Sequence, residues 1–77
     1  MIHIGKEIEK AIRNQGKSVT WFAAQLDCTR VTVYNIFHRK NIDTQQLYRI
    51  SIVLKHNFFA DCSDAFKKVL SDRKVNH

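Results

Sequence analysis

Apolar residues recur at spacings of three and four along most of this chain, which is the period of an amphipathic α-helix. In the first such segment, residues 4–15, the apolar residues fall on one helix face: Ile4, Ile8, Ala11 and Ile12. Gly16 follows this segment and can take the left-handed conformation that ends many helices. The pattern predicts an all-α fold, a compact bundle of four to five short helices.

Polar residues suited to helix N-caps divide the rest of the chain. Ser18, Thr29 and Asp43 can each accept a hydrogen bond from a backbone N–H group one turn later, and Gln46 completes a capping box with Asp43. We therefore expect one helix directly after Ser18 and two more at about Arg30–Phe37 and Thr44–Lys55.

A fifth, short helix is predicted after a cap at Asn57, where Phe58 and Phe59 form a pair large enough to close the core. The inner faces of the middle helices are expected to be buried: Val19, Phe22, Ala23, Leu26, Val33, Ile36, Phe37, Leu47, Ile50, Ser51 and Leu54. Ala23 is small, so it allows another helix to cross closely.

The length of 77 residues corresponds to a single domain with a small core. The helical pattern decays after Phe66 into a stretch rich in charge. We therefore expect residues 1–66 to form the folded domain and residues 67–77 to form a basic C-terminal tail, partly disordered from about residue 68.

Thirteen basic and seven acidic residues give the chain a net charge of +6. For so small a domain this excess favours a polyanion as partner, although a basic surface also serves solubility alone. Residues 1–40 carry seven basic and three acidic groups, and residues 41–77 carry six and four, so the charge does not localise a site.

Several classes of protein are not expected. No stretch approaches the roughly 18 apolar residues of a membrane span, and the N-terminal residues do not resemble a signal peptide, so a cytoplasmic location is predicted. Cys28 and Cys62 are then expected to be reduced and, at this spacing, not to bind a metal. The histidines stand far apart with no carboxylate motif, so we predict neither an enzyme nor a cofactor.

Residues 18–38 form two predicted helices joined by a tight turn, with polar residues on one face of the second. An α-helix fits the major groove of DNA, where each base pair shows a distinct pattern of donors, acceptors and methyl groups. Arg30 can contact guanine, Asn35 can contact adenine, and Val31 and Thr32 can pack on a thymine methyl. The alternative is an ordinary solvated helix face.

Residues 22–37 resemble the centre of the lambda-repressor-like family of helix-turn-helix proteins, also called XRE or Cro/C1 type. The family pattern Leu-Ala-x-x-Leu-Gly-Val-Ser-x-x-Thr-Ile-Ser-x-Ile and its fourth helix are matched in register at Phe22, Ala23, Leu26, Cys28, Thr29, Thr32, Val33, Ile36, Leu47, Ile50 and Leu54. The similarity covers about residues 4–66. It implies sequence-specific binding of double-stranded DNA by a bacterial or phage-type transcriptional regulator, with the helix at about Arg30–Phe37 in the major groove.

The resemblance also assigns residues. Four are expected to contact bases: Arg30, Val31, Thr32 and Asn35. Two are expected from the resemblance to contact the DNA backbone: Thr29 and Tyr34. Four more are expected to contact the backbone outside the family's pattern: Lys17, Ser18, Arg39 and Lys40. The chain departs from the family at Asp27 in the turn, where Gly is usual, at Val19, where a phosphate-binding Gln is common, and at residues 37–39, where Glu-Asn-Gly is common.

Partners other than DNA are also considered. Tyr48, Ile52 and Val53 exceed what the inner face of their helix needs. We expect them to form a homodimer surface, to be scattered surface residues or to contact the C-terminal tail. Antitoxin-like proteins use the same fold, so a protein-interaction module is the second interpretation. The positive charge also permits RNA binding. The exposed aromatic side chains on which single-stranded bases stack are scarce, however, because Tyr34 is the one good candidate.

Overall fold

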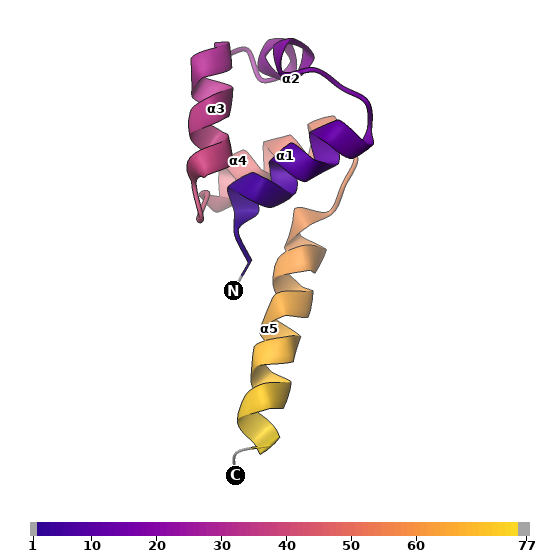
Figure 1. Ribbon diagram of the computed structural model, residues 1–77, viewed down its shortest axis with the longest axis vertical. Helices are drawn as coiled ribbons and strands as arrows, with labels where there is room; N and C mark the ends of the chain where they lie inside the picture. The colour runs from indigo at the N-terminus through magenta and orange to yellow at the C-terminus, as the bar shows by residue number, and fades with distance from the viewer. Residues whose placement is uncertain (1, 76–77) are drawn as a thin grey trace.

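The computed structural model describes residues 2–75, with side chains through residue 72, and consists of five α-helices. They are α1 (Ile4–Asn14), α2 (Val19–Gln25), α3 (Arg30–His38), α4 (Thr44–Leu54) and α5 (Phe58–Val75). No strand occurs in this part of the chain, so the predicted all-α fold is confirmed. The first four helices form a bundle, and α5 projects away from it (Figure 1).

The N-caps predicted from the sequence are confirmed. Side-chain oxygens of Ser18, Thr29 and Asp43 accept hydrogen bonds from the backbone N–H three residues later, at 3.0, 3.2 and 2.8 Å. The carboxamide oxygen of Asn57 does the same at 3.1 Å. Each cap pairs an N–H that the helix itself leaves without a partner, so the starts of four helices are determined locally.

Three helices end on a residue in the left-handed conformation. Gly16, Asp27 and Lys55 have φ values of 67°, 54° and 51° and follow α1, α2 and α4 respectively. In each case the N–H of the next residue donates to the carbonyl oxygen five residues earlier, at 3.0 to 3.1 Å. This is the Schellman motif, which pairs carbonyl groups at the helix end and turns the chain sharply.

The core is apolar and draws on every helix. Its buried members are Ile4, Ile8, Ile12, Phe22, Ala23, Leu26, Val33, Ile36, Phe37, Leu47, Ile50, Leu54 and Phe58. Nearly all of the predicted inner-face residues belong to it. Val19 and Ser51 are the exceptions, because both are half-buried. Phe58 and Phe59 were predicted to close the core together. Phe58 is fully buried there, whereas Phe59 is 37% exposed.

The start of α1 approaches the end of α3 closely. The N–H groups of Ile4 and Gly5 donate to the carbonyl oxygens of Lys40 and Arg39, at 3.2 and 2.9 Å. A Cβ atom on Gly5 would lie 2.6 Å from the carbonyl carbon of Phe37, and the crossing therefore requires glycine. Because α1 and α2 are the helices packed most closely on α3, this contact helps to fix the position of α3.

The helix α5 is longer than the short helix that the sequence predicted, and that part of the prediction was wrong. Partial disorder of the tail stays a prediction. The helix is continuous over 18 residues, a length of about 27 Å, and the predicted boundary after residue 66 falls inside it. Helical spacing continues at Cys62, Phe66 and Val69, with no Gly or Pro to interrupt it. Residues 76 and 77 of the predicted tail lie outside the described residues.

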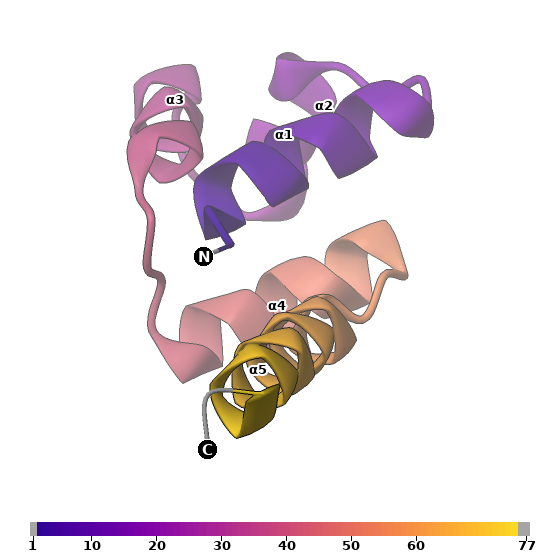
Figure 2. The same cartoon turned by 60° about the horizontal axis from the view of Figure 1, so that its bottom comes forward.

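The long α5 makes the molecule elongated. Its extents are 49 × 20 × 20 Å and its radius of gyration is 14.1 Å, against about 11–12 Å for a compact chain of this length. Figure 1 shows α5 running out of the bundle, and in Figure 2, where the bottom of the molecule comes forward, its C-terminal end points toward the viewer. Within residues 2–75, none of the helices combines the length and the apolar character that a bilayer crossing requires.

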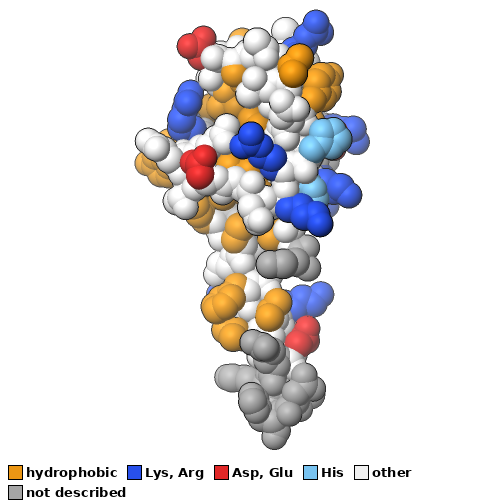
Figure 3. Space-filling model, turned by 90° about the vertical axis from the view of Figure 1, so that its left-hand side faces the viewer, with side chains coloured by type: hydrophobic (Ala, Val, Ile, Leu, Met, Phe, Trp, Pro, Cys, Tyr) orange, Lys and Arg blue, Asp and Glu red, His pale blue; other side chains and the backbone are white. Residues whose placement is uncertain are grey.

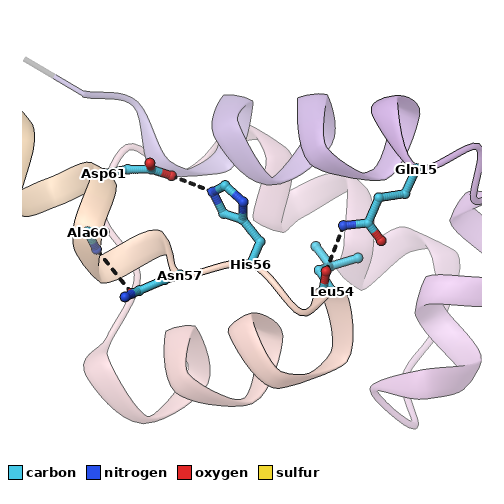
Figure 4. Close-up of polar contacts among 6 residues, drawn as sticks. All are labelled: Gln15, Leu54, His56, Asn57, Ala60 and Asp61. Carbon is cyan, nitrogen blue, oxygen red and sulfur yellow. Dashed lines mark hydrogen bonds and ion pairs between the residues drawn. The ribbon is translucent and has the colours of Figure 1, made fainter.

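Side-chain contacts set the direction of α5 where it leaves α4. Nε2 of His56 lies 2.7 Å from the carboxylate of Asp61, and the His56 ring packs on that of Phe58 with centroids 4.5 Å apart (Figure 4). The side chain of Gln15 donates to the carbonyl oxygen of Leu54 at 2.6 Å, which ties the end of α1 to the end of α4.

Candidate nucleic-acid interface

The helix α3 has one buried face and one exposed face. Val33, Ile36 and Phe37 point into the core, with exposed fractions of 0%, 1% and 7%. All four residues predicted to contact bases are exposed: Arg30, Val31, Thr32 and Asn35. The fold therefore brings them together on the surface of one helix.

The geometry of a helix orders these residues further. At 100° per residue, Val31 and Asn35 lie near the centre of the exposed face, while Arg30 and Thr32 lie at its two edges. His38 is also exposed and occupies the same central strip, because it follows Asn35 by three residues. The sequence interpretation missed His38, although this spacing was sufficient to find it.

The N-terminus of α3 has a hydroxyl pair. Oγ1 of Thr29 accepts the N–H of Thr32 and also lies 3.2 Å from Oγ1 of Thr32. When the Thr32 hydroxyl is the donor in this pair, the hydroxyl proton of Thr29 stays free to donate to an anion. The same residue can thus cap α3 and donate to a phosphate oxygen there.

Tyr34 is held in place by the core beneath it. Its ring meets that of the buried Phe37 edge to face, with centroids 6.1 Å apart and planes at 82°, and Tyr34 is 51% exposed. An aromatic ring packed in this way limits the positions open to its hydroxyl group. Tyr34 can therefore reach the edge of a groove with little loss of side-chain entropy.

The other predicted backbone contacts are all exposed, but they lie on different segments. Lys17 and Ser18 precede α2, where Nζ of Lys17 lies 4.9 Å from the ring centroid of Trp21. Arg39 and Lys40 follow α3, and their backbone carbonyl groups are anchored on the start of α1.

The basic residues on α3 and just after it form no ion pair with the described side chains. Among the side chains of residues 2–72, the ion pairs are Glu9–Arg13 and His56–Asp61, and neither involves α3. Arg30, Arg39 and Lys40 are thus unpaired within that range. Figure 3 shows the side of the bundle on which α3 lies, where Lys and Arg side chains are more prominent than acidic ones.

Two departures from the family pattern have clear structural consequences. Asp27 takes the left-handed conformation that the family assigns to Gly, as its short polar side chain permits. Val19 packs against the core, so the residue at this position offers no polar group to a phosphate. The turn therefore forms with Asp27, and Val19 cannot make the phosphate contact that the resemblance would imply.

Two other features bear on function. Over the described residues, no three His, Cys, Asp or Glu side chains come together as a metal site would require, and Cys28 and Cys62 are free thiols. Tyr48 and Ile52, predicted as a dimer surface, are 60% and 59% exposed, whereas Val53 is half-buried and packs against the core.

Comparisons of this chain with family models, with curated proteins and with solved structures find no match. The resemblance to the lambda-repressor-like family therefore stays a prediction from the sequence. The function proposed below rests on that prediction together with the geometry of α3.

Proposed function

We propose that this chain binds double-stranded DNA in a sequence-specific manner and acts as a transcriptional regulator of the lambda-repressor-like (XRE, Cro/C1) helix-turn-helix type. The observation that carries the proposal is the two-sided character of α3. Its apolar face is locked into the core, and its exposed face presents Arg30, Thr32 and Asn35, whose side chains suit base edges.

The mechanism follows from the positions of these groups. A nine-residue helix is about 13 Å long and fits into the major groove, which is about 12 Å wide. In this mechanism Asn35 at the centre of the face contacts an adenine, and Arg30 at its edge contacts a guanine or the adjoining phosphate. Arg39, Lys40 and the hydroxyl group of Thr29 bind phosphates on either side and so fix the register.

In this mechanism, the packing that holds α3 in place is as important for base recognition as the residues on its exposed face. Base recognition requires side chains held to within fractions of an ångström, so a loosely packed helix would lose specificity. The Thr29 cap, the left-handed Asp27 and the crossing at Gly5 each restrain α3 at a different point. The second interpretation, an antitoxin-like protein, uses the same surface for DNA and adds a protein partner.

Selection of binding sites from random duplexes tests the proposal, because it reports binding and base preference together. The selected site is then used to compare Arg30→Ala with Arg13→Ala at fixed salt. Both variants lose one positive charge, but Arg13 lies on α1, where it pairs with Glu9. We expect Arg30→Ala to weaken specific binding by about 1–3 kcal/mol and to relax one base position.

The control and the salt dependence distinguish base contacts from bulk charge. Arg13→Ala should stay within about threefold of the parent, because a charge outside the contact surface is largely screened. Lys40→Ala should weaken binding to all sequences alike and lower the salt slope by about 1. No enriched motif, or equal effects of the Arg30 and Arg13 variants, would refute the proposed function.

A further inference from the structure

The first turn of α1 pairs its backbone N–H groups with partners outside the helix itself. Such partners are needed because an α-helix leaves its leading N–H groups unpaired. Those of Ile4 and Gly5 donate to two carbonyl oxygens of the segment that follows α3, at 3.2 and 2.9 Å. The next one, that of Lys6, donates to Nδ1 of the half-buried His3 at 3.1 Å. A single imidazole ring therefore completes the start of this helix.

Histidine differs from the residues that cap the other helices of this chain. Those caps are oxygen atoms of Ser18, Thr29, Asp43 and Asn57, which keep an acceptor lone pair in every charge state. Nδ1 of His3 accepts a hydrogen bond only while it carries no proton, because both ring nitrogens of an imidazolium are donors. Imidazole groups change their charge between about pH 5 and 8. Of these five caps, the cap of α1 is the one that depends on pH in this range.

The surroundings of His3 are unfavourable for a second positive charge. On its own helix, Lys6 and Glu7 carry opposite charges. The segment that packs on the start of α1 from α3 is residues 38–40, which are His-Arg-Lys. On the side of α5, the groove beside Ile2 is lined by uncharged residues. A proton on His3 therefore adds a cation where cations exceed anions, and where the helix dipole also has its positive end.

We propose that His3 is a pH-sensitive N-cap, which closes the first turn of α1 in its neutral form and releases this turn when it is protonated. A proton from solvent and the N–H of Lys6 compete for the same lone pair of Nδ1. Once the proton is bound, two donors face each other, so the ring rotates away and the N–H of Lys6 loses its acceptor. The stability that the cap contributes is therefore present at pH 8 and is lost as the pH falls toward 5.

Release of this turn acts on the segment after α3. The N–H groups of Ile4 and Gly5, which hold the carbonyl groups of Lys40 and Arg39, belong to the same turn as the capped N–H. The backbone of Gly5 also lies against the last turn of α3. When the first turn of α1 frays, these contacts lose their geometry, while the Thr29 cap at the other end of α3 is unaffected. Acid thus loosens the junction of α1 with the end of α3.

A second histidine responds to acid in the opposite sense. Nε2 of His56 lies 2.7 Å from the carboxylate of Asp61, so a proton on His56 strengthens the attraction between the two side chains. Acidification therefore favours the contact between α4 and α5 while it disfavours the cap of α1. The pH dependence of the whole chain combines both effects, and the contribution of His3 has to be measured as a difference between variants.

Urea denaturation of the full chain at pH 8 and at pH 5 tests the cap through His3→Asn. Asparagine is a good N-cap, and its oxygen atom accepts a hydrogen bond at both pH values. Between pH 8 and pH 5, we expect the folding equilibrium constant of the parent to fall about fivefold more than that of His3→Asn. The matched control is His38→Asn, which removes an exposed histidine from the last turn of α3 and should not reduce the loss in acid.

Nuclear magnetic resonance locates the effect within the chain. The ¹³Cα chemical shifts of Gly5 and Lys6 report the helix content of the first turn, and in the parent they should move toward random-coil values as the His3 ring is protonated. They should stay helical in His3→Asn, and the shift of Thr32 should stay helical in both chains. Equal losses in acid for the parent and His3→Asn, or a first turn that remains helical at pH 5 in the parent, would overturn the proposal. Neither measurement involves DNA, so the result is independent of the proposed function.

Discussion

Replacing Gly5 by alanine tests the packing that holds α3 in place. The new Cβ atom would lie 2.6 Å from the carbonyl carbon of Phe37 and closer still to the carbonyl oxygens of Ile36 and Phe37. These are backbone atoms, so no side chain can rotate away. The start of α1 must therefore move from α3, which stretches the hydrogen bonds from Ile4 and Gly5.

The cost can be estimated from these contacts. Overpacking in a dense core costs about 1–3 kcal/mol, and each weakened hydrogen bond costs about 1 kcal/mol. The better helix propensity of alanine returns up to about 1 kcal/mol. We therefore expect the free energy of unfolding to fall by about 2–4 kcal/mol, a large fraction of the roughly 4–12 kcal/mol typical of a chain this size.

Urea denaturation followed by circular dichroism at 222 nm measures this loss, and thermal scans should show a Tm lower by about 10–20 °C. Gly16→Ala is the matched control. Gly16 has φ of 67° but open space around it, so alanine there adds only backbone strain of about 1 kcal/mol. If Gly5→Ala is no more destabilising than Gly16→Ala, the close approach of α1 and α3 is not what makes glycine necessary.

Two further substitutions should raise stability. Lys55 adopts φ of 51°, so Lys55→Gly should stabilise the chain by about 1 kcal/mol in urea denaturation, and Asp27→Gly should give a smaller gain because Asp tolerates this conformation better. A larger gain at Asp27 would contradict the assignment of strain. The buried hydroxyl of Ser51 has no hydrogen-bond partner among the described residues, so Ser51→Ala should also gain about 1 kcal/mol, whereas an unchanged or lower midpoint would show that the hydroxyl is satisfied.

The sequence alone determined where most helices begin and end. Ser18, Thr29 and Asp43 act on backbone groups within one turn, and Gly16 acts on the residues just before it, so these signals do not depend on the rest of the fold. The apolar period likewise identified the buried face of α3, since a helix places every third or fourth residue on one side. The exposed residues of the candidate interface followed from the same period.

Features that depend on distant residues were not accessible in this way. The need for glycine at position 5 arises from Ile36 and Phe37, which reach it only when α1 crosses α3, and Gln15 binds Leu54 across 39 positions of the chain. The length of α5 was underestimated because the helical pattern was judged to decay after Phe66 into a stretch rich in charge. The tertiary structure decided that the residues of this stretch lie outside the core, on a projecting helix, because α1 to α4 already enclose the core with Phe58.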